Sequence, residues 1–330
     1  MICIVDGTTD PCWNLAAEEY LLTDVHEPVF RLWRNAPSVI IGRYQNALAE
    51  INTEYIQTHN IPVVRRLTGG GAVFHDLGNI NYTFIDKKIP DEDTGAMFRR
   101  FTAPIIEALK GLGLNASLQG RNDLVIEDRK FSGNAVCVHG GRVLQHGTLL
   151  FSASVADLSA ALNTRPEKFT GKSVQSNRAR VTNISEHLTG TLRGMSAEDF
   201  LNYLQSRIAD SNGCITRSYT QTETAGIDRL SESKYATWQW NFGNSPHYGL
   251  NRIRKFPSGL IEVSLDVSGG IIRSCSIRGD YFFTRPTEEV EQALTGLPHS
   301  YGSILTALSA LPLTDYFGPV PTTDIALLLF

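Results

Sequence analysis

The sequence predicts a mixed α+β protein made of a large domain and a smaller C-terminal one. Its 330 residues exceed what a single hydrophobic core usually organises. β-rich runs and helical patterns follow one another along the chain, and the Asn-, Gly-, Ser- and Pro-rich stretch at 241–248 is typical of a domain junction. We therefore expect a large domain over residues 1–244 and a small α+β domain over 250–330.

Capping and turn residues divide the first part of the chain into short elements. Asp10 before Pro11 is typical of a capped helix start. The β-rich runs 29–33 and 38–42, with the turn signal Asn35-Ala36-Pro37 between them, predict a hairpin. A short helix is expected to follow.

A strand expected over 61–66 leads into the triplet Gly69-Gly70-Gly71. Two further β-like runs, 72–74 and 80–85, come after the triplet and are joined by a polar turn. The order of strand and glycine loop is the first indication of function.

Later segments predict further hairpins and helices. Leu124-Val125-Ile126 and Phe131 flank Glu127-Asp128-Arg129, which predicts a hairpin with Lys130 on its return strand. Apolar residues at helical spacing over 101–112 predict a helix that begins near Pro104 or is kinked there. An acidic capping box, a glycine-turn hairpin and two more helices are expected at 196–208, 260–277, 288–294 and 303–308.

The composition is that of an ordinary globular protein, with 42% apolar and 19% charged residues. A net charge of -4 gives no overall field that would attract nucleic acid or an anionic membrane. The five cysteines are scattered and never spaced as C-x-x-C, so neither a disulfide framework nor a zinc site is expected. The chain shows no signal peptide and no long apolar run, and we expect a reduced, cytoplasmic protein.

The segment from Arg65 to Asp76 combines paired arginines, a hydroxyl and three glycines. Glycine lets backbone N–H groups approach an anion closely, and arginine supplies a planar fork of donors for phosphate or carboxylate. A glycine triplet alone would more often serve a tight turn, but the adjoining arginines favour a phosphate cradle. The loop lacks the pattern G-x-x-x-x-G-K-[ST] and no long helix follows it, which disfavours P-loop and Rossmann sites.

Four other side chains are candidates for chemistry. A cleft lysine at Lys130 would neutralise a carboxylate and then a phosphate during adenylation, although spacing alone leaves a solvated lysine equally open. His75 and His146 are candidate acid–base or hydrogen-bonding groups, but an isolated histidine is more often structural. Cys137 is a candidate acyl-accepting nucleophile, while a buried small residue is the commoner case.

Four ordered motifs, taken together, resemble the signatures of the lipoate-protein ligase family. They are the run from Arg65 to Asn79, Gly120-Arg121-Asn122-Asp123, Lys130-Phe131-Ser132-Gly133 and His146-Gly147-Thr148-Leu149-Leu150. The resemblance also includes Trp13-Asn14-Leu15-Ala16-Ala17-Glu18-Glu19, Leu32-Trp33-Arg34-Asn35, Arg180-Val181-Thr182-Asn183 and Trp238-Gln239-Trp240-Asn241-Phe242-Gly243. It therefore extends over the large domain and into the small one.

This resemblance implies the fold of biotin-protein ligases and class II aminoacyl-tRNA synthetases, a mixed sheet packed with helices, and a small α+β accessory domain. It implies that lipoate and Mg-ATP form lipoyl-AMP and pyrophosphate, after which the lipoyl group passes to a carrier lysine. The implied carriers are apo lipoyl domains of 2-oxo acid dehydrogenase E2 subunits and the glycine cleavage H protein. We expect a monomer that binds neither nucleic acid nor membrane, and the metal-binding residues stay unknown.

Matching positions carry the family's site onto this chain. The resemblance implies that Lys130 is catalytic and that it contacts the adenylate together with Arg66, Gly71, Ala72, Val73 and Phe74. It implies that the substrate pocket is lined by Gly70, His75, Asn79, Asn122, Asp123, Ser132, Gly133 and His146. An apolar tunnel for the lipoyl chain is expected near residues 33–41.

Three positions depart from the family's usual residues. Thr68 and Asn134 stand where serine is common, and Gln145 stands where a second histidine often precedes His146. Thr68 keeps its hydroxyl, whereas the other two are expected to bear on substrate preference or carrier docking.

Two other functions stay open. One is an ATP-independent lipoyl or octanoyl amidotransferase that uses Cys137. The other is a non-catalytic lipoyl- or nucleotide-binding protein. The C-terminal domain disfavours the first, and the retained Lys130, Arg66 and glycine loop disfavour the second.

Overall fold

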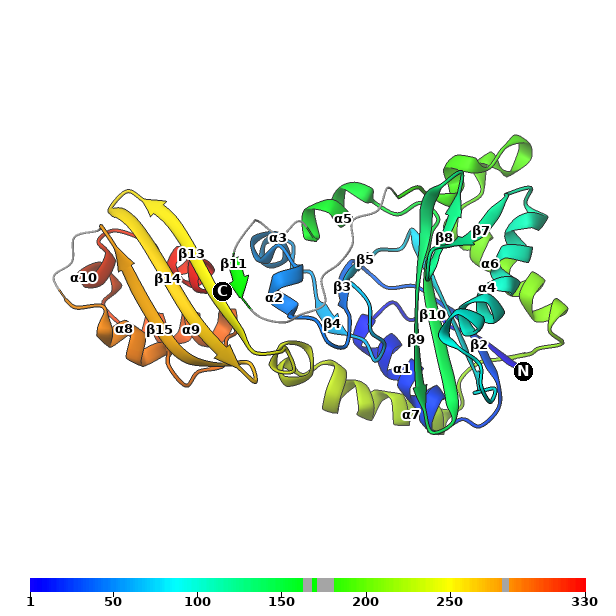
Figure 1. The fold of residues 1–330 in the computed structure, drawn as a ribbon, viewed down its shortest axis with the longest axis horizontal. Helices are drawn as coiled ribbons and strands as arrows, with labels where there is room; N and C mark the ends of the chain where they lie inside the picture. Colours follow the sequence, from blue (N-terminus) through cyan, green and yellow to red (C-terminus); the bar gives the residue numbers. More distant parts are fainter. Residues whose placement is uncertain (163–167, 171–180, 281–284) are drawn as a thin grey trace. The chain divides into compact units, whose positions relative to one another are not determined.

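The computed structural model describes residues 1–162, 168–170, 181–280 and 285–330. The chain divides into two compact units, and neither is continuous in sequence (Figure 1). Unit 1 comprises Met1–Arg43, Pro62–Ser159 and Ser176–Thr237; unit 2 comprises Tyr44–Ile61, Ala160–Gln175 and Trp238–Phe330. The domain boundary expected between residues 244 and 250 stays a prediction.

An eight-stranded mixed sheet organises unit 1, in the order β12-β1-β2-β6-β10-β9-β8-β7 (Figure 1). β1 pairs in parallel with β12 and β2, and all pairs from β2 to β7 are antiparallel. The strands are β1 (Ile2–Val5), β2 (Val29–Trp33), β6 (Asn79–Lys87), β7 (Ala116–Gln119), β8 (Asp123–Ile126), β9 (Arg129–His139), β10 (Arg142–Leu150) and β12 (Ile215–Arg217). The hairpin predicted around residues 127–129 is confirmed as β8 and β9.

A three-stranded sheet in unit 1 carries the glycine loop. It consists of β4 (Val63–Arg65), β3 (Ser38–Ile41) and β5 (Val73–His75), in the order β4-β3-β5. Because β3 pairs with β4 and β5, the hairpin predicted over 29–42 is wrong. The physical reason is competition for strand edges, since β1 and β6 already occupy both edges of β2.

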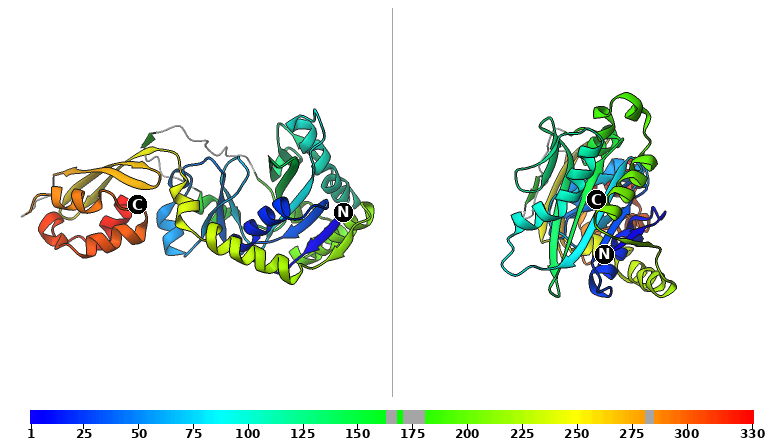
Figure 2. Two further views of the ribbon diagram at one scale, coloured as in Figure 1. Left: turned by 90° about the horizontal axis from the view of Figure 1, so that it is seen from below. Right: turned by 90° about the vertical axis from the view of Figure 1, so that its right-hand side faces the viewer.

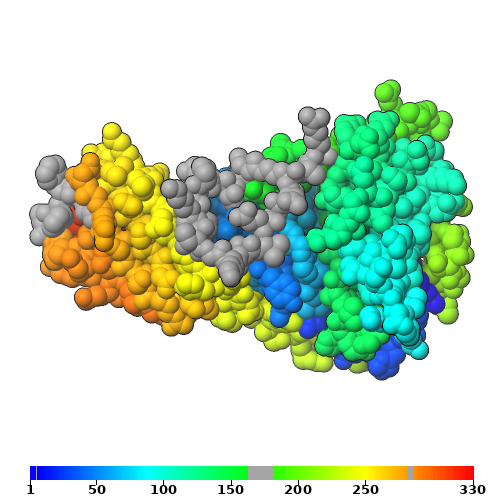
Figure 3. All heavy atoms as spheres, in the orientation of Figure 1, coloured from blue at the N-terminus to red at the C-terminus, as the bar shows by residue number. Residues whose placement is uncertain are grey.

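Helices cover both faces of the large sheet. α4 (Thr94–Gly111) and α6 (Ala197–Ser211) pack against one face, and α1 (Pro11–Thr23) packs against the other with α7 (Gln221–Leu230) alongside it (Figure 2). The remaining helical elements of unit 1 are α5 (Val155–Ala161), two 3-10 turns (Ile184–His187 and Gly190–Gly194) and a π-helical turn (Ser231–Tyr235). The side of unit 1 toward the viewer in Figure 3 is formed mainly by residues 90–150, coloured cyan to green.

Capping predictions hold where the signal is local. Asp10 accepts the backbone N–H of the residue three positions on, and Ser196 and Asp199 form the predicted reciprocal capping box. Pro104 lies inside α4, so the expectation of a helix start near it is wrong. Asp93 caps the observed start, and buried apolar side chains before and after the proline keep the helix packed on the sheet.

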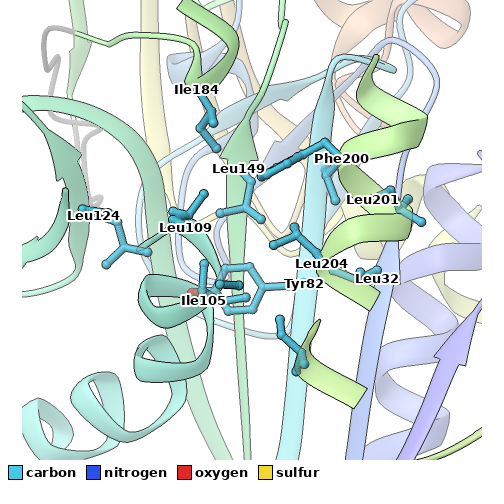
Figure 4. Close-up of a cluster of buried hydrophobic side chains, with 14 of the residues drawn as sticks. Leu32, Tyr82, Ile105, Leu109, Leu124, Leu149, Ile184, Phe200, Leu201 and Leu204 are labelled. Atoms are coloured by element: carbon cyan, nitrogen blue, oxygen red, sulfur yellow. The ribbon is translucent and has the colours of Figure 1, made fainter. Parts of the chain in front are cut away.

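Side chains alternate between the two faces of the large sheet, as the two-residue period of a strand requires. On the face covered by α4 and α6, called the α4 face, Phe84, Val143 and Leu149 belong to the large apolar cluster. Figure 4 shows Leu149 among other members of this cluster. Their neighbours Ile85 and Leu144 pack instead with apolar residues of α1, on what we call the α1 face.

Two departures from the family pattern meet on the α4 face. The Gln145 side-chain amide donates to Oδ1 of Asn134 (2.9 Å), and the Tyr82 hydroxyl donates to the same oxygen. Nδ2 of Asn134 in turn donates to the Ser132 hydroxyl (3.2 Å). All four residues are buried, so the two unusual side chains are hydrogen-bonded to each other inside the core, although Oε1 of Gln145 has no hydrogen-bond partner among the described residues.

Unit 2 contains a four-stranded sheet in the order β11-β13-β14-β15. Its strands are β11 (Lys168–Thr170), β13 (Tyr248–Phe256), β14 (Gly259–Ser268) and β15 (Ile271–Gly279), and its helices are α2 (Ala47–Glu50), α3 (Thr53–Thr58), α8 (Glu288–Leu294), α9 (Tyr301–Ser309), α10 (Leu313–Phe317) and α11 (Thr322–Leu329), with a π-helical turn at Gln239–Gly243. The predicted glycine-turn hairpin is confirmed as β14 and β15, with Gly269 and Gly270 at φ 59° and 73°. In neither unit does a helix of the described residues have the length and apolarity needed to cross a membrane.

Gly147 of the His146-Gly147-Thr148 motif makes room for the polar core network. A Cβ at this position would lie 2.2 Å from Oδ1 of Asn134 and 2.7 Å from the Tyr82 ring. We expect Gly147→Ala to reduce the free energy of unfolding by about 2 kcal/mol, a typical cost of overpacking, as measured by urea denaturation.

Gly194→Ala is the matched control, because a Cβ at Gly194 meets nothing within 4 Å. Equal stability losses for the two alanine variants would contradict this account of Gly147.

Candidate active site

The buried side chain of Arg66 is hydrogen-bonded to several residues of the glycine loop. Its guanidinium donates to the carbonyl oxygens of Gly69 (2.7 Å) and Gly71 (2.7 Å) and to Oγ1 of Thr68 (3.0 Å). Because C=O and N–H point in opposite directions across a trans peptide, these bonds turn the Gly70 N–H away from the cation. Gly70 has a φ of 92°, which favours glycine at this bend.

The hydrogen bonds of Arg66 continue through Thr68 and His146 to the buried carboxylate of Glu18. Both carboxylate oxygens of Glu18 lie 2.9 Å from Nδ1 of His146, and Nε2 of His146 lies 2.8 Å from Oγ1 of Thr68. Since an ionised carboxylate only accepts, Nδ1 of His146 carries a proton and donates to Glu18. Hydrogen bonds therefore connect Arg66 to Glu18 through Thr68 and His146.

Opposing effects set the pKa values of Glu18 and Arg66, the residues at the two ends of this hydrogen-bond chain. Burial alone would raise the pKa of Glu18, but the charge and hydrogen bonds of His146, with the Thr83 hydroxyl, hold that pKa below its ordinary value. Burial lowers the pKa of Arg66 to about 10, and the charge of Glu18 offsets part of that effect. At neutral pH this chain of hydrogen bonds therefore joins the ionised Glu18 carboxylate to the Arg66 guanidinium.

His75 is fixed by a second chain that also starts on α1. Nδ2 of Asn14 donates to Oδ1 of Asn35 (2.8 Å), which orients the Asn35 amide so that it donates to Nδ1 of His75 (3.1 Å). The proton of His75 then resides on Nε2, which is buried without a hydrogen-bond partner among the described residues. Burial, with the charges of Arg66 and His146, lowers the pKa of His75 to about 3, so the ring is neutral.

Lys130 lies on the same face of the sheet as His146. Its Nζ is 2.7 Å from Oδ1 of Asp123, and the two side chains are 27% and 34% exposed. Gly133 leaves room for the lysine, since a Cβ there would lie 3.2 Å from Nζ. The Gly133 N–H donates to Oγ1 of Thr148 (3.2 Å), and Thr148 stands opposite Asn81, whose amide approaches His75. The lysine and the two histidine chains thus line one face.

The structure brings most of the sequence-predicted site residues together. Arg66, Gly70, Gly71, His75, His146, Asp123, Gly133 and Lys130 belong to the loop or to the α1 face. Asn79 is buried, with its amide bonded to Asn81, while Ala72, Val73 and Phe74 continue from the loop into β5. Ser132 and Asn122 bond instead to Asn134, Ser132 from within the α4 face, so neither is joined to this set.

Sequence reasoning missed the residues that fix the two histidines. Glu18 and Asn14 occurred only within stretches quoted for the family resemblance, Asn35 also formed part of the predicted turn at 35–37, and none of the three was assigned a role at the site. A usable signal was the polar spacing itself, since Asn14 and Glu18 stand four residues apart within an apolar helix and are both buried.

Comparison with known proteins places the chain in a class. The model of the lipoyl protein ligase A/B catalytic domain matches residues 10–209, and that of the bacterial lipoate protein ligase C-terminus matches residues 245–329. The chain therefore contains a lipoyl protein ligase catalytic domain followed by a lipoate protein ligase C-terminal domain.

Curated relatives make the assignment specific. The lipoate-protein ligase LplJ of Bacillus subtilis (strain 168) is 40% identical over 326 residues, covering 97% of each chain, and lipoate-protein ligase 1 of Staphylococcus aureus is 39% identical over 328 residues, covering 98% of each. The chain belongs to the lipoate-protein ligase family, as the sequence motifs predicted.

Solved structures agree with the expected α+β fold. P. falciparum LipL1 in complex with lipoate has a TM-score of 0.62 at 26% identity and covers 94% of each chain. Lipoate-protein ligase A bound with ATP has a TM-score of 0.62 at 27% identity, over 74% of this chain and 98% of that one. A bipartite lipoate protein ligase from Thermoplasma acidophilum, described with its E2 lipoyl domain, has a TM-score of 0.63 at 27% identity, over 74% and 96%.

The hydroxyl of Thr68 links Arg66 to His146, and its removal tests this connection. Thr68→Val leaves Nε2 of His146 unpaired, whereas Nε of Arg66 keeps its bond to the Gly69 carbonyl oxygen, and an unpaired buried group costs about 1–3 kcal/mol. We expect kcat/KM for protein lipoylation to fall by about 10- to 100-fold.

Thr68→Ser, which keeps the hydroxyl, is the control and should stay within about threefold of the wild type. A valine variant as active as the serine variant would show that the link is dispensable.

Proposed function

We propose that the chain activates lipoate with ATP between the glycine loop and Lys130, and then passes the lipoyl group to a lysine of a carrier domain. One observation supports this proposal: Lys130 lies on the same face of the sheet as His146, which is hydrogen-bonded to Thr68 of the loop that Arg66 holds. The ATP-bound and lipoate-bound relatives support the same pair of substrates.

The first step brings two anions together. A carboxylate oxygen of lipoate attacks the α-phosphorus of ATP, the bond from that phosphorus to the bridging oxygen breaks, and pyrophosphate leaves with the electron pair. Preorganised cations and N–H groups offset the repulsion between the reacting anions. In the second step, the carrier amine attacks the acyl carbon, AMP leaves, and an amide forms.

Lys130 is proposed as the catalytic residue because its ammonium group is held at the site by a carboxylate. Asp123 balances that charge at 2.7 Å before substrate binds. We propose that the lipoate carboxylate, and then the α-phosphate, takes over this contact. An ammonium group suits the exchange because it is a compact point charge with three donors.

Arg66 is proposed to act chiefly through the loop. Its guanidinium is bonded to Gly69, Gly71 and Thr68, so it fixes the backbone that faces the adenylate. Direct contact with phosphate would require it to release one of these bonds. The expected contacts of the adenylate with Gly71 and the following three residues stay a prediction.

His75 and Asn79 are proposed to bind substrate. Nε2 of His75 and Oδ1 of Asn79 are buried and lack hydrogen-bond partners among the described residues. Such groups cost free energy unless a ligand or water pairs with them. The neutral His75 ring would donate to a substrate oxygen without adding charge.

Magnesium is proposed to arrive with ATP. Within residues 1–162, 168–170, 181–280 and 285–330, no group of three His, Cys, Asp or Glu side chains is placed to hold a metal ion. Mg²⁺ is commonly bound through substrate phosphates with few protein carboxylates, which fits this donor set. It would neutralise phosphate charge during the first step.

Cys137 is a poor candidate for the nucleophile of an amidotransferase. Burial, with the nearby carboxylates Glu18 and Glu19, raises the pKa of its thiol to about 12. The reactive thiolate is therefore scarce at neutral pH. The ATP-independent mechanism is disfavoured for this reason.

The proposed carriers are apo lipoyl domains of 2-oxo acid dehydrogenase E2 subunits and the glycine cleavage H protein. Support for the first comes from the Thermoplasma acidophilum ligase described with its E2 lipoyl domain. We propose a cytoplasmic site of action, because ATP is the co-substrate and the cysteines are free thiols.

Replacement of Lys130 tests the proposed function. With lipoate, Mg-ATP and an apo E2 lipoyl domain, the wild type should release pyrophosphate and add one lipoyl mass to the carrier. Lys130→Ala should reduce both rates by about 100-fold or more, the usual cost of removing a group that stabilises transition-state charge.

Lys110→Ala is the control, because that lysine is 74% exposed and only loosely paired with Glu107. Its rates should stay within about twofold of the wild type. Lipoyl transfer without ATP would support an amidotransferase, and binding without turnover would support a non-catalytic protein.

A further inference from the structure

The segment Val181-Thr182-Asn183, here called the strap, belongs to a motif for which the sequence suggested no role. Arg180, the first residue of that motif, lies outside the described residues. Val181 forms a parallel bridge with Lys130, and the Thr182 N–H donates to the Lys130 carbonyl oxygen at 2.9 Å. The strap thus contacts the backbone of the proposed catalytic lysine.

This contact occurs where β9 lacks its usual neighbour. The β9–β10 pairing extends only from His139 to Asn134, so it stops short of Lys130. On the other side, the register of β8 and β9 shifts beside Lys130, which stands opposite Val125. A bulge re-aims the side chains next to it, so the direction of the lysine depends on what holds this part of the strand.

The strap is itself anchored on the segment that follows β10. Oδ1 of Asn183 accepts the Ala153 N–H (2.9 Å), and its Nδ2 donates to the Ala153 carbonyl oxygen (3.1 Å). Thr182, at 1% exposed, is held through its hydroxyl, which lies 3.0 Å from Oε2 of Glu186 and 3.0 Å from Nε2 of His187. Two hydrogen bonds from one amide to a single residue leave little freedom for the strap.

The segment that holds the strap is itself hydrogen-bonded to the turn after β5, which follows the glycine loop. The Ser154 N–H donates to Oδ2 of Asp76 (2.7 Å), and the Gly78 carbonyl oxygen accepts the N–H groups of Phe151 and Ser152 (both 3.0 Å). Gly78 is required there, because a Cβ would lie 2.3 Å from the Ser152 carbonyl oxygen. The turn that follows His75 and the strand that carries Lys130 are therefore connected through the strap.

We propose that Asn183 is a positioning residue for Lys130, which it serves by fixing the strap whose Thr182 N–H holds the lysine backbone. The inference rests on the proposed catalytic role of Lys130. The side-chain amide of Asn183 is bonded to Ala153, and its effect on the reaction passes through the backbone of β9.

A double-mutant cycle tests this inference in the full chain. Lipoate affinity is measured by isothermal titration for the wild type, Asn183→Ala, Lys130→Ala and the double variant. We expect Asn183→Ala alone to weaken binding by about tenfold, and to weaken it by less than about twofold when Lys130 is already alanine. Equal losses in both backgrounds would overturn the inference, as would no loss in the single variant.

Two further variants keep the result interpretable if Asn183→Ala is unstable. Asn183→Asp keeps the acceptor for the Ala153 N–H and loses the donor, so its loss should lie between wild type and alanine. Asn212→Ala removes a comparable side-chain bond, from Nδ2 to the Ile208 carbonyl oxygen (2.8 Å), at the end of α6, and should leave lipoate affinity unchanged. An aspartate variant weaker than alanine, or a weakened Asn212→Ala, would count against a role through Lys130.

The cycle separates this inference from the proposed function. If Lys130→Ala leaves pyrophosphate release and lipoate affinity intact, the catalytic role of the lysine fails. If Lys130→Ala disables the enzyme while Asn183→Ala behaves like the wild type, only the positioning role fails.

Discussion

The buried carboxylate of Glu18 is the interaction on which the site depends. An ionised carboxylate inside a protein costs several kcal/mol unless hydrogen bonds and charges compensate it. Here His146 contacts both oxygens and the Thr83 hydroxyl donates to one of them, while Arg31 supplies a more distant positive charge. Each of these groups must therefore stay in position to stabilise the carboxylate. His146 also contacts Thr68, and Arg66 is bonded to Thr68, Gly69 and Gly71, so the position of the glycine loop depends on the same hydrogen bonds.

Residues of helix α1 orient both histidines of the site. Glu18 accepts a hydrogen bond from Nδ1–H of His146, and Nε2 of the same ring contacts the Thr68 hydroxyl of the glycine loop. Asn14 acts through Asn35 to make Nδ1 of His75 an acceptor, which leaves Nε2–H as a donor. One helix turn thus fixes the orientation of both histidine rings at the site.

Local signals in the sequence predicted local structure well. Asp10 as a helix cap, the Ser196–Asp199 capping box and the turn before Lys130 each depend on residues within a few positions of one another. The prediction of a hairpin over 29–42 was wrong because β1 and β6 pair with both edges of β2. No local sequence pattern indicates these two pairings. β13 was missed for a related reason, since its start overlaps the polar stretch interpreted as a junction.

The same distinction explains what was found and missed at the site. Motifs identified Lys130 and the glycine loop because the residue types alone, glycine, lysine and arginine, indicate anion binding. The importance of Glu18 depends on a partner 128 positions away, and that of Asn134 on its contact with Gln145 across two strands. The alternation of β10 then separates the two sets: His146 and Thr148 lie on the α1 face with Lys130, while Gln145 and Gly147 lie on the α4 face. The two unusual residues bond to each other on the core side of the sheet, so neither departure replaces a side chain of the α1 face.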